Sequence, residues 1–147
     1  MTSKSKVYFF FDKVTINLKG RAGLKKAIEG IFKREKKDLV GVNYVFCSDK
    51  ALLKINRQYL QHDDYTDIIT FDLSETGSGI VGEIYISIDR VRDNARKNEV
   101  LLKTELLRVI FHGALHLCGY NDKTSDEKTR MRGKENYYLS YFTDCST

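Results

Sequence analysis

The sequence predicts one domain of the α/β or α+β class, in which helices cover a central mixed β-sheet of about four strands. Segments with the two-residue period of strands interleave with segments that have the 3.6-residue period of helices. The chain has 147 residues, 41% of them hydrophobic, which suits one domain with one core. Proline is absent and no repeat divides the chain, so residues 1–147 are expected to fold as one domain.

The N-terminal quarter is predicted to contain a strand and a helix. Residues 7–10 form a short β-type run. Residues 21–35 are expected to be helical because their apolar side chains have the spacing of one buried stripe, formed by Leu24, Ile28, Ile31 and Phe32. The lysines of this segment then lie on the opposite side of the helix.

The next segment is predicted to be strand, helix and strand. Residues 39–47 are nearly all apolar or β-branched, which is typical of a buried strand. Ser48 or Asp49 can cap a following helix that reaches about Leu60. Residues 66–73 form the next strand candidate.

A glycine-rich turn and a further strand are expected after that. Residues 75–79 read ETGSG, a turn composition. Residues 83–88 alternate strictly and would place three isoleucines on one face of a strand, namely Ile84, Ile86 and Ile88. Asp89 can begin a short helix over residues 89–98.

Two helices complete the chain. The helix over residues 103–118 has the clearest apolar stripe and is expected to end at Gly119; the stripe is Leu106, Leu107, Ile110, Phe111, Ala114 and Leu117. The last helix is expected over residues 124–142, because Thr124 and Glu127 have the spacing of a capping box.

Basic residues are concentrated at the N-terminal end. Residues 1–37 contain eleven Lys and Arg but three Asp and Glu, whereas the whole chain has a net charge of +5. This asymmetry is typical of a footprint for a polyanion. A solvated lysine-rich helix face explains it equally well.

The expected compartment is the cytoplasm. The three cysteines, Cys47, Cys118 and Cys145, are odd in number and show no CxxC spacing. No apolar segment has the character of a signal peptide or the length of about 20 residues that a membrane span needs. We therefore expect reduced thiols and no membrane partner.

The segment HGALHLCGYND, residues 112–122, carries the chemistry. On a helix, His112 and His116 are about 40° apart and project from one face, which is the geometry of a metal chelate. Gly119 can stop the helix and turn the chain, so that Asp122 returns toward the two imidazoles. Three protein ligands with a fourth position left to water are typical of a catalytic zinc site.

Other interpretations of this segment remain open. Two histidines at helical spacing are commonly surface or core residues with ordinary hydrogen bonds. Cys118 lies about 200° around the helix from His116 and is expected to face away, as a small core residue.

Position 113 decides between reaction classes. In HExxH metalloproteases a glutamate follows the first histidine and acts as general base, whereas Gly113 has no side chain. Peptide hydrolysis by that mechanism is disfavoured. A Lewis-acidic ion with a water of lowered pKa remains, able to act at a phosphoryl group, with the proton acceptor unidentified.

These residues resemble the YbeY family of rRNA maturation factors, whose hallmark is HGxLHLxGYDH. The similarity includes INRQY at residues 55–59, TDIITF at 66–71 and GEIYISID at 82–89, and the tail matches at Met131 and Glu135. It covers roughly residues 39–139. The resemblance implies an α/β fold with a zinc ion in a cleft, endoribonuclease activity, and a role in ribosomal RNA processing and ribosome quality control.

The chain departs from the family pattern at the third metal ligand. The family has histidine where this sequence has Asp122, which remains a competent oxygen ligand. Its negative charge should make a bound water less acidic and shift preference toward harder metals. Asn121, which replaces the family aspartate, is the poorer ligand candidate.

A second departure concerns an arginine that the resemblance implies contacts RNA or takes part in catalysis. Leu60 occupies its position. Arg57 and His62 are the nearest substitutes, and His62 is a candidate proton acceptor, although a lone loop histidine is more often solvated.

Glu105 lies seven residues before His112, on the same helix face. It is a candidate for orienting a histidine ligand. An exposed glutamate in the first turn, stabilised by the helix dipole, is the alternative.

The sequence thus predicts a metal-dependent endoribonuclease with one Zn²⁺, or another divalent ion, on His112, His116 and Asp122. The expected partners are RNA, above all rRNA, and the ribosome, with no DNA and no membrane. The competing hypothesis is an RNA- or ribosome-binding assembly factor in which the metal is structural.

Overall fold

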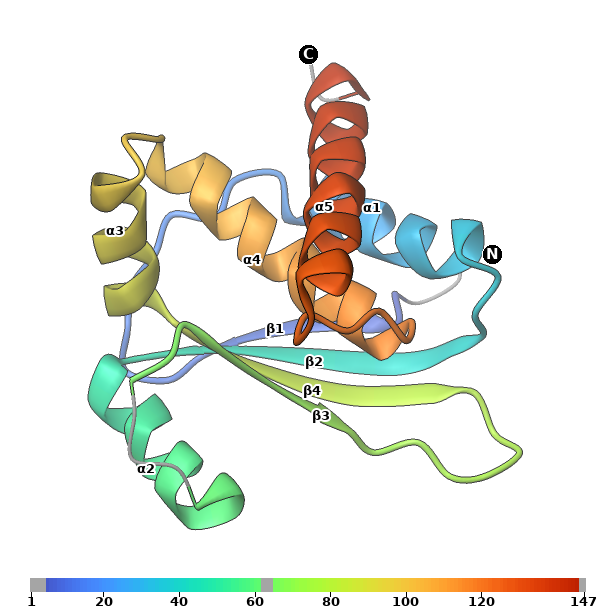
Figure 1. Ribbon diagram of the computed structural model, residues 1–147, viewed down its shortest axis with the longest axis horizontal. Helices are drawn as coiled ribbons and strands as arrows, with labels where there is room; N and C mark the ends of the chain where they lie inside the picture. The colour runs from blue at the N-terminus through green and yellow to red at the C-terminus, as the bar shows by residue number, and fades with distance from the viewer. Residues whose placement is uncertain (1–4, 62–64, 146–147) are drawn as a thin grey trace.

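A four-stranded mixed sheet forms the centre of the fold (Figure 1). The computed structural model describes residues 5–61 and 65–145. The sheet order is β1-β2-β4-β3, and its strands are β1 (Val7–Phe11), β2 (Leu39–Cys47), β3 (Ile68–Asp72) and β4 (Ile80–Ser87). β2 pairs in parallel with β1 and with β4, whereas β3 runs antiparallel to β4. The predicted mixed sheet is confirmed.

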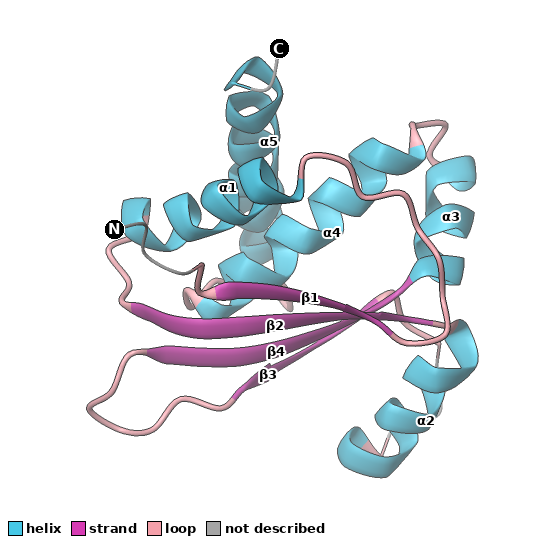
Figure 2. Ribbon diagram, turned by 180° about the vertical axis from the view of Figure 1, so that it is seen from behind, coloured by secondary structure: helices cyan, strands magenta, loops and turns pink. Residues whose placement is uncertain are grey.

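Helices cover the sheet unequally, as Figures 1 and 2 show from opposite sides. The elements are α1 (Arg21–Arg34), α2 (Asp49–Leu60), α3 (Ile88–Lys97), α4 (Leu102–Leu117) and α5 (Ser125–Cys145). The helices α1, α3, α4 and α5 lie on one side of the sheet, and α2 lies on the other. Among the described helices, none combines the length and apolar character needed to cross a bilayer.

The main core lies between the sheet and the four-helix side. Strand residues that alternate along β2 and β4, including Tyr44, Phe46, Ile84 and Ile86, are fully buried there. The predicted stripes of α1 and α4 face them, and each residue of both stripes is buried. The Tyr44 hydroxyl donates a hydrogen bond of 2.8 Å to the Ile110 carbonyl, which satisfies a buried phenol and ties β2 to α4.

The predicted boundaries were wrong in a few places. Ile88 is buried as expected, but it is the first residue of α3, because the Ser87 hydroxyl accepts a hydrogen bond from the Arg90 N–H and caps that helix. β3 is shorter than residues 66–73, and α5 continues beyond residue 142. In β2 one face is largely buried and the other is partly open, as Val40 shows with 55% exposure, because α2 covers only part of the second face of the sheet.

Two glycines allow α4 to lie directly on β4. A Cβ atom at Gly113 would be 2.9 Å from Ile84 Cδ1 and 3.0 Å from Ile68 Cδ1. A Cβ at Gly82 would be 2.5 Å from Leu117 Cδ1. A Cβ at either position would force the Ile84, Ile68 or Leu117 side chain to shift, so the two glycines favour the close packing of the C-terminal half of α4 on the sheet.

The capping box predicted for the last helix is present. The Thr124 Oγ1 accepts a hydrogen bond from the Glu127 N–H at 3.1 Å, and Glu127 Oε1 accepts one from the Thr124 N–H at 2.9 Å. The helix therefore begins at Ser125, close behind the segment that carries Asp122.

Candidate metal centre

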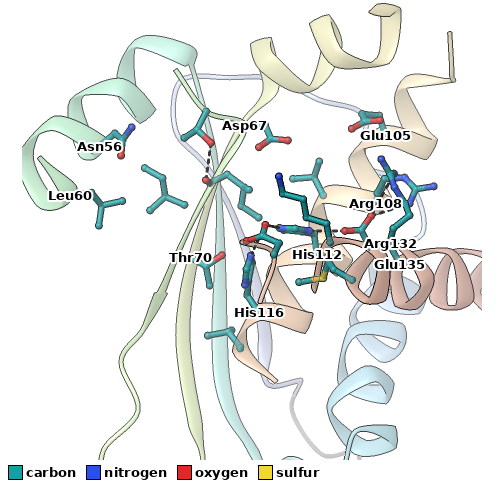
Figure 3. Close-up of a pocket in the computed structure, with 18 of the residues that line it drawn as sticks. Asn56, Leu60, Asp67, Thr70, Glu105, Arg108, His112, His116, Arg132 and Glu135 are labelled. Atoms are coloured by element: carbon teal, nitrogen blue, oxygen red, sulfur yellow. Dashed lines mark hydrogen bonds and ion pairs between the residues drawn. The ribbon is translucent and has the colours of Figure 1, made fainter. Parts of the chain in front are cut away.

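Two histidines project from the last turns of α4, as their spacing predicts. The ring centroids of His112 and His116 lie 4.5 Å apart, and the ring planes are nearly perpendicular. Both side chains are only partly exposed, at 19% and 26%. Figure 3 shows them side by side at the wall of one pocket.

Gly119 ends α4 and reverses the chain. Its φ is +105°, a conformation that glycine adopts without a Cβ penalty. The Gly119 N–H donates to the His116 carbonyl, and the Tyr120 N–H donates to the Leu115 carbonyl, which is the Schellman pattern. This turn returns the chain over the histidines, and Asp122 Oδ2 lies 3.2 Å from His112 Nε2 and 3.3 Å from His116 Nε2.

The three side chains are placed to hold a metal ion. Their ligand atoms all lie within 4.8 Å of one another. An ion bound tetrahedrally at about 2.0 Å separates its ligand atoms by about 3.3 Å, which matches the two distances from Asp122. Two imidazole nitrogens and one carboxylate oxygen are a donor set that suits zinc and other divalent metals, with one position left free.

Glu135 of α5 contacts His112 at Nδ1, the ring nitrogen that does not face Asp122. Its Oε2 lies 2.6 Å from His112 Nδ1, while Oε1 accepts a 3.0 Å hydrogen bond from Arg108 Nη1. Burial opposes the charged form of both Glu135 and His112, yet their mutual contact lowers the pKa of Glu135 and raises that of His112. A carboxylate at Nδ1 directs Nε2 toward Asp122, as in metal sites whose histidines donate to a carboxylate.

His112, His116 and Asp122, together called the metal group, lie in a cleft of about 960 Å³ between α2, β3, α4 and α5. Asn56 and Leu60 of α2 lie across this cleft from the histidines (Figure 3). Three basic residues line it, Arg108, Lys128 and Arg132. Burial raises the pKa of Asp67, a further carboxyl group of the lining, and the nearby His112 opposes that rise.

The two doubtful ligand candidates lie elsewhere. The exposed Asn121 bonds to Glu127 and is not part of the cleft wall, so the preference for Asp122 over its neighbour agrees with the geometry. Cys118 is buried in the main core, as predicted, and burial raises the pKa of its thiol to about 12.

Leu60, which occupies the position of the family arginine, lies in the wall of the cleft. It is 42% exposed, so an apolar side chain stands where the resemblance implies a cation. Arg57 lines a separate small pocket beside α2. His62, the other suggested substitute, lies outside the described residues.

Neither interpretation of Glu105 agrees with the structure. Its side chain is 7% exposed, which excludes a solvated position. Within the described part of the chain no hydrogen bond joins it to either histidine; Glu135 makes that contact instead. Residue spacing could not reveal Glu135, which is 23 positions from His112. Its match to the tail of the family was the one available signal.

The basic N-terminal segment does not contribute to the cleft. None of the described residues before position 56 lines it, and its cations come from α4 and α5. The charge asymmetry of the sequence therefore belongs to another surface.

The family model and the named relatives that match this chain all carry the same description. The family model described as Endoribonuclease YbeY matches residues 11–143. A relative from Cytophaga hutchinsonii named Endoribonuclease YbeY is 50% identical over 134 residues, which are 91% of this chain and 94% of the relative. A relative of the same name from Amoebophilus asiaticus is 43% identical and covers 92% of each chain.

A solved structure shares the fold. The solution structure of TM1509 from Thermotoga maritima superposes with a TM-score of 0.64 and 31% sequence identity. The match covers 92% of this chain and 88% of that one. The two proteins thus share a fold over most of their length.

Proposed function

The chain belongs to the YbeY family of endoribonucleases, and from this premise we propose that it hydrolyses phosphodiester bonds in RNA with a metal ion bound by His112, His116 and Asp122. The observation that carries the proposal is the convergence of three ligand atoms at the wall of an open cleft. The wider role proposed with this activity is maturation of ribosomal RNA, in the cytoplasm and on the ribosome.

Held by His112, His116 and Asp122, a divalent ion would supply a Lewis acid and would lower the pKa of a bound water molecule. The residues of the chain do the remaining work. Glu135 fixes the ring of His112, and the Schellman turn at Gly119 fixes Asp122. A rigid arrangement of this kind avoids the cost of ordering the ligands when the substrate binds.

Zinc is the proposed metal because two imidazoles and a carboxylate with an open position are typical of catalytic zinc sites. The carboxylate of Asp122 adds a hard ligand and a negative charge. Manganese is therefore the strongest competitor.

RNA is proposed to enter along the basic side of the cleft. The Arg132 side chain is 61% exposed, and Lys128 is also exposed at the rim. Arg108 donates to Glu135 Oε1 at 3.0 Å and Arg132 Nη1 lies 3.7 Å from the same oxygen, but the more exposed Arg132 and Lys128 can still reach phosphate oxygens. Phosphate contacts of this kind position RNA without reading its sequence.

The alternative function is an assembly factor that binds RNA while the metal stabilises the fold. Structural zinc sites have four protein ligands and are closed to solvent. Here, among the described residues, the metal group consists of three side chains, each partly exposed. This difference favours catalysis.

The variant Asp122→Ala tests the proposal. We expect it to lose RNA cleavage while it keeps its thermal unfolding midpoint and its affinity for RNA. Asn121→Ala is the matched control, since Asn121 is adjacent in sequence but outside the cleft, and it should cleave like the wild type. Full cleavage by Asp122→Ala would refute the proposed site.

Metal content is measured on the same preparations. Elemental analysis of the wild type should give one divalent ion per chain, and a chelator should abolish cleavage that added zinc or manganese restores. Cleavage by metal-free protein would exclude the mechanism. So would stoichiometric metal in the double variant His112→Ala, His116→Ala.

A further inference from the structure

A second large groove lies on the opposite side of α4 from the metal centre. It has a volume of about 1000 Å³ and shares no lining residue with the metal cleft. Its walls are α1, the start of α4, the end of α5 and the loop of residues 12–20. Figure 2 shows this loop running past α3 to α1. The groove therefore belongs to a surface that the proposed nuclease reaction does not use.

The floor of this groove is apolar and mostly aliphatic, and α5 adds Tyr138, Tyr141 and Phe142 to the lining. Its aliphatic part is formed by side chains that also pack on the main core, from the 12–20 loop, α1 and α4, namely Ile16, Leu18, Leu24, Ala27, Leu102 and Leu106. A concave apolar floor of this extent favours a ligand that brings apolar side chains of its own.

The charged residues of the lining all have one sign. Six are basic, and no Asp or Glu occurs in the described lining; the six are Lys19, Lys26, Lys33, Arg34, Arg92 and Lys103. Two of the six are engaged within the chain, because Arg34 donates to the Tyr137 hydroxyl and Arg92 to the Thr15 carbonyl. The four lysines form no ion pair with any residue that the structure describes. Their charges are therefore available to an external anion.

Two glycines of α1 keep the groove open. A Cβ added at Gly23 or Gly30 would have no atom within 4 Å, so internal packing does not require glycine at either position. Glycine inside a helix costs about 0.5–1 kcal/mol relative to alanine. Both residues line the groove, where a larger side chain would occupy its space.

From this floor and rim we infer that the groove binds an acidic, amphipathic segment of a partner protein. Apolar side chains of the segment pack on the aliphatic floor, and its carboxylates meet the lysine rim. RNA fits the rim but fits the floor poorly, because bases need open aromatic faces for stacking. Of the aromatic rings in the lining, Tyr138 is buried and Tyr141 is covered by Arg34, which lies 3.8 Å from its ring centroid. The surplus of lysine and arginine in residues 1–37 then serves a protein partner, and the nuclease centre stays accessible on the other side of α4.

The full-length chain can be titrated against a fluorescein-labelled peptide of about 16 residues, with leucines at i, i+3, i+4 and i+7 spacing and glutamates elsewhere. Fluorescence anisotropy should report saturable binding that weakens by about tenfold when salt is raised from about 50 mM to about 500 mM. A peptide with lysine in place of each glutamate should not bind. Equal affinity for the two peptides would overturn the inference.

Two groove variants separate charge from shape. Lys26→Glu combined with Lys33→Glu should weaken the acidic peptide by at least about tenfold, while Lys50→Glu with Lys54→Glu on α2 makes the same charge change outside the groove and should have little effect. Gly30→Leu fills the groove without changing charge, should also weaken the peptide, and should fold at least as stably because leucine is the better helix former.

Three results would overturn the inference. The first is an unchanged peptide affinity in Gly30→Leu, which would mean that the peptide binds by nonspecific charge attraction and does not enter the groove. The second is a loss of RNA affinity in the double variant Lys26→Glu, Lys33→Glu while its affinity for the peptide is unchanged. The third is a dimer of the chain, seen by sedimentation, that Gly30→Leu dissolves. Metal-dependent RNA cleavage, measured in parallel, should be unchanged in all these variants. The absence of cleavage in the wild type would concern the proposed function alone.

Discussion

The Nδ1 atom of His112 lies 2.6 Å from the Oε2 atom of Glu135, although the two residues come from different helices. This contact connects the metal group on α4 to α5. It leaves Nε2 of the same ring 3.2 Å from Asp122 Oδ2, so the orientation of one proposed ligand depends on a carboxylate outside the group of His112, His116 and Asp122.

Glu135→Ala should therefore weaken metal binding by about 10–100-fold, because the ring of His112 loses the group that orients it. Glu135→Gln keeps an acceptor oxygen for Nδ1 and should recover most of the affinity. Competition with a chromogenic zinc chelator measures both. Asn136→Ala, at the exposed neighbouring position, serves as control; an unchanged zinc affinity in Glu135→Ala would contradict the assigned role.

Restoring histidine at the third ligand should change metal preference. Asp122→His replaces a hard, charged donor with a neutral imidazole, so the affinity for manganese relative to zinc should fall by roughly tenfold. Competition between the two ions, followed by elemental analysis, gives the ratio. An unchanged ratio would argue that Asp122 is not a ligand, and Asn121→His should leave it unaffected.

A methyl group at Gly113 should destabilise the fold. Gly113→Ala places Cβ 2.9 Å from Ile84 Cδ1, and crowding of this kind costs about 1–3 kcal/mol. Gly133→Ala is the matched control within α5, since its Cβ meets nothing within 4 Å, and it should be neutral or stabilising by up to about 1 kcal/mol. Urea unfolding of both variants checks the contrast. Equal midpoints would mean that α4 can move away from the sheet at little cost.

Acid should weaken the attachment of α5 through Glu35, the residue that follows α1. Glu35 accepts hydrogen bonds from the Tyr138 hydroxyl at 2.5 Å, the Tyr120 hydroxyl at 2.7 Å and Lys134 Nζ at 3.1 Å. Burial by itself would raise its pKa, but these donors together hold the pKa below its usual value of 4.5. A lowered pKa stabilises the fold fully above 4.5, and this contribution is lost as the pH falls through the lower pKa of the folded state.

Glu35→Gln should accordingly lose about 1–3 kcal/mol of unfolding free energy at pH 7. The difference from wild type should shrink as the pH falls below 4.5, where the wild-type carboxylate becomes protonated. Urea unfolding at a series of pH values gives both numbers. A difference that stays constant over this range would contradict the assignment.

The sequence predicted most of the secondary structure because its patterns are local. The stripe of α1 and the isoleucines of β4 are periodic within one element, and the buried faces followed from that period alone. The bounds were less certain because caps decide them: Ser87 ends β4 one residue before the alternation ends.

The sequence by itself also determined the relative position of two of the three residues in the metal group. His112 and His116 are one turn apart on a helix, so their relative position is set by helix geometry, and Gly119 indicated that the chain would turn after them. The direction of that return, which brings Asp122 within 3.3 Å of His116, became definite only with the hydrogen bonds of the turn.

Only the tertiary structure decided which distant groups meet. Glu135 reaches His112 because α5 packs across α4, and the basic N-terminal segment lines a groove away from the metal cleft. Glu105 is buried and has no hydrogen bond to a histidine among the described residues. Such contacts depend on how separate elements pack, and the free energy of packing is distributed over the whole core. No period or spacing within a single segment encodes them.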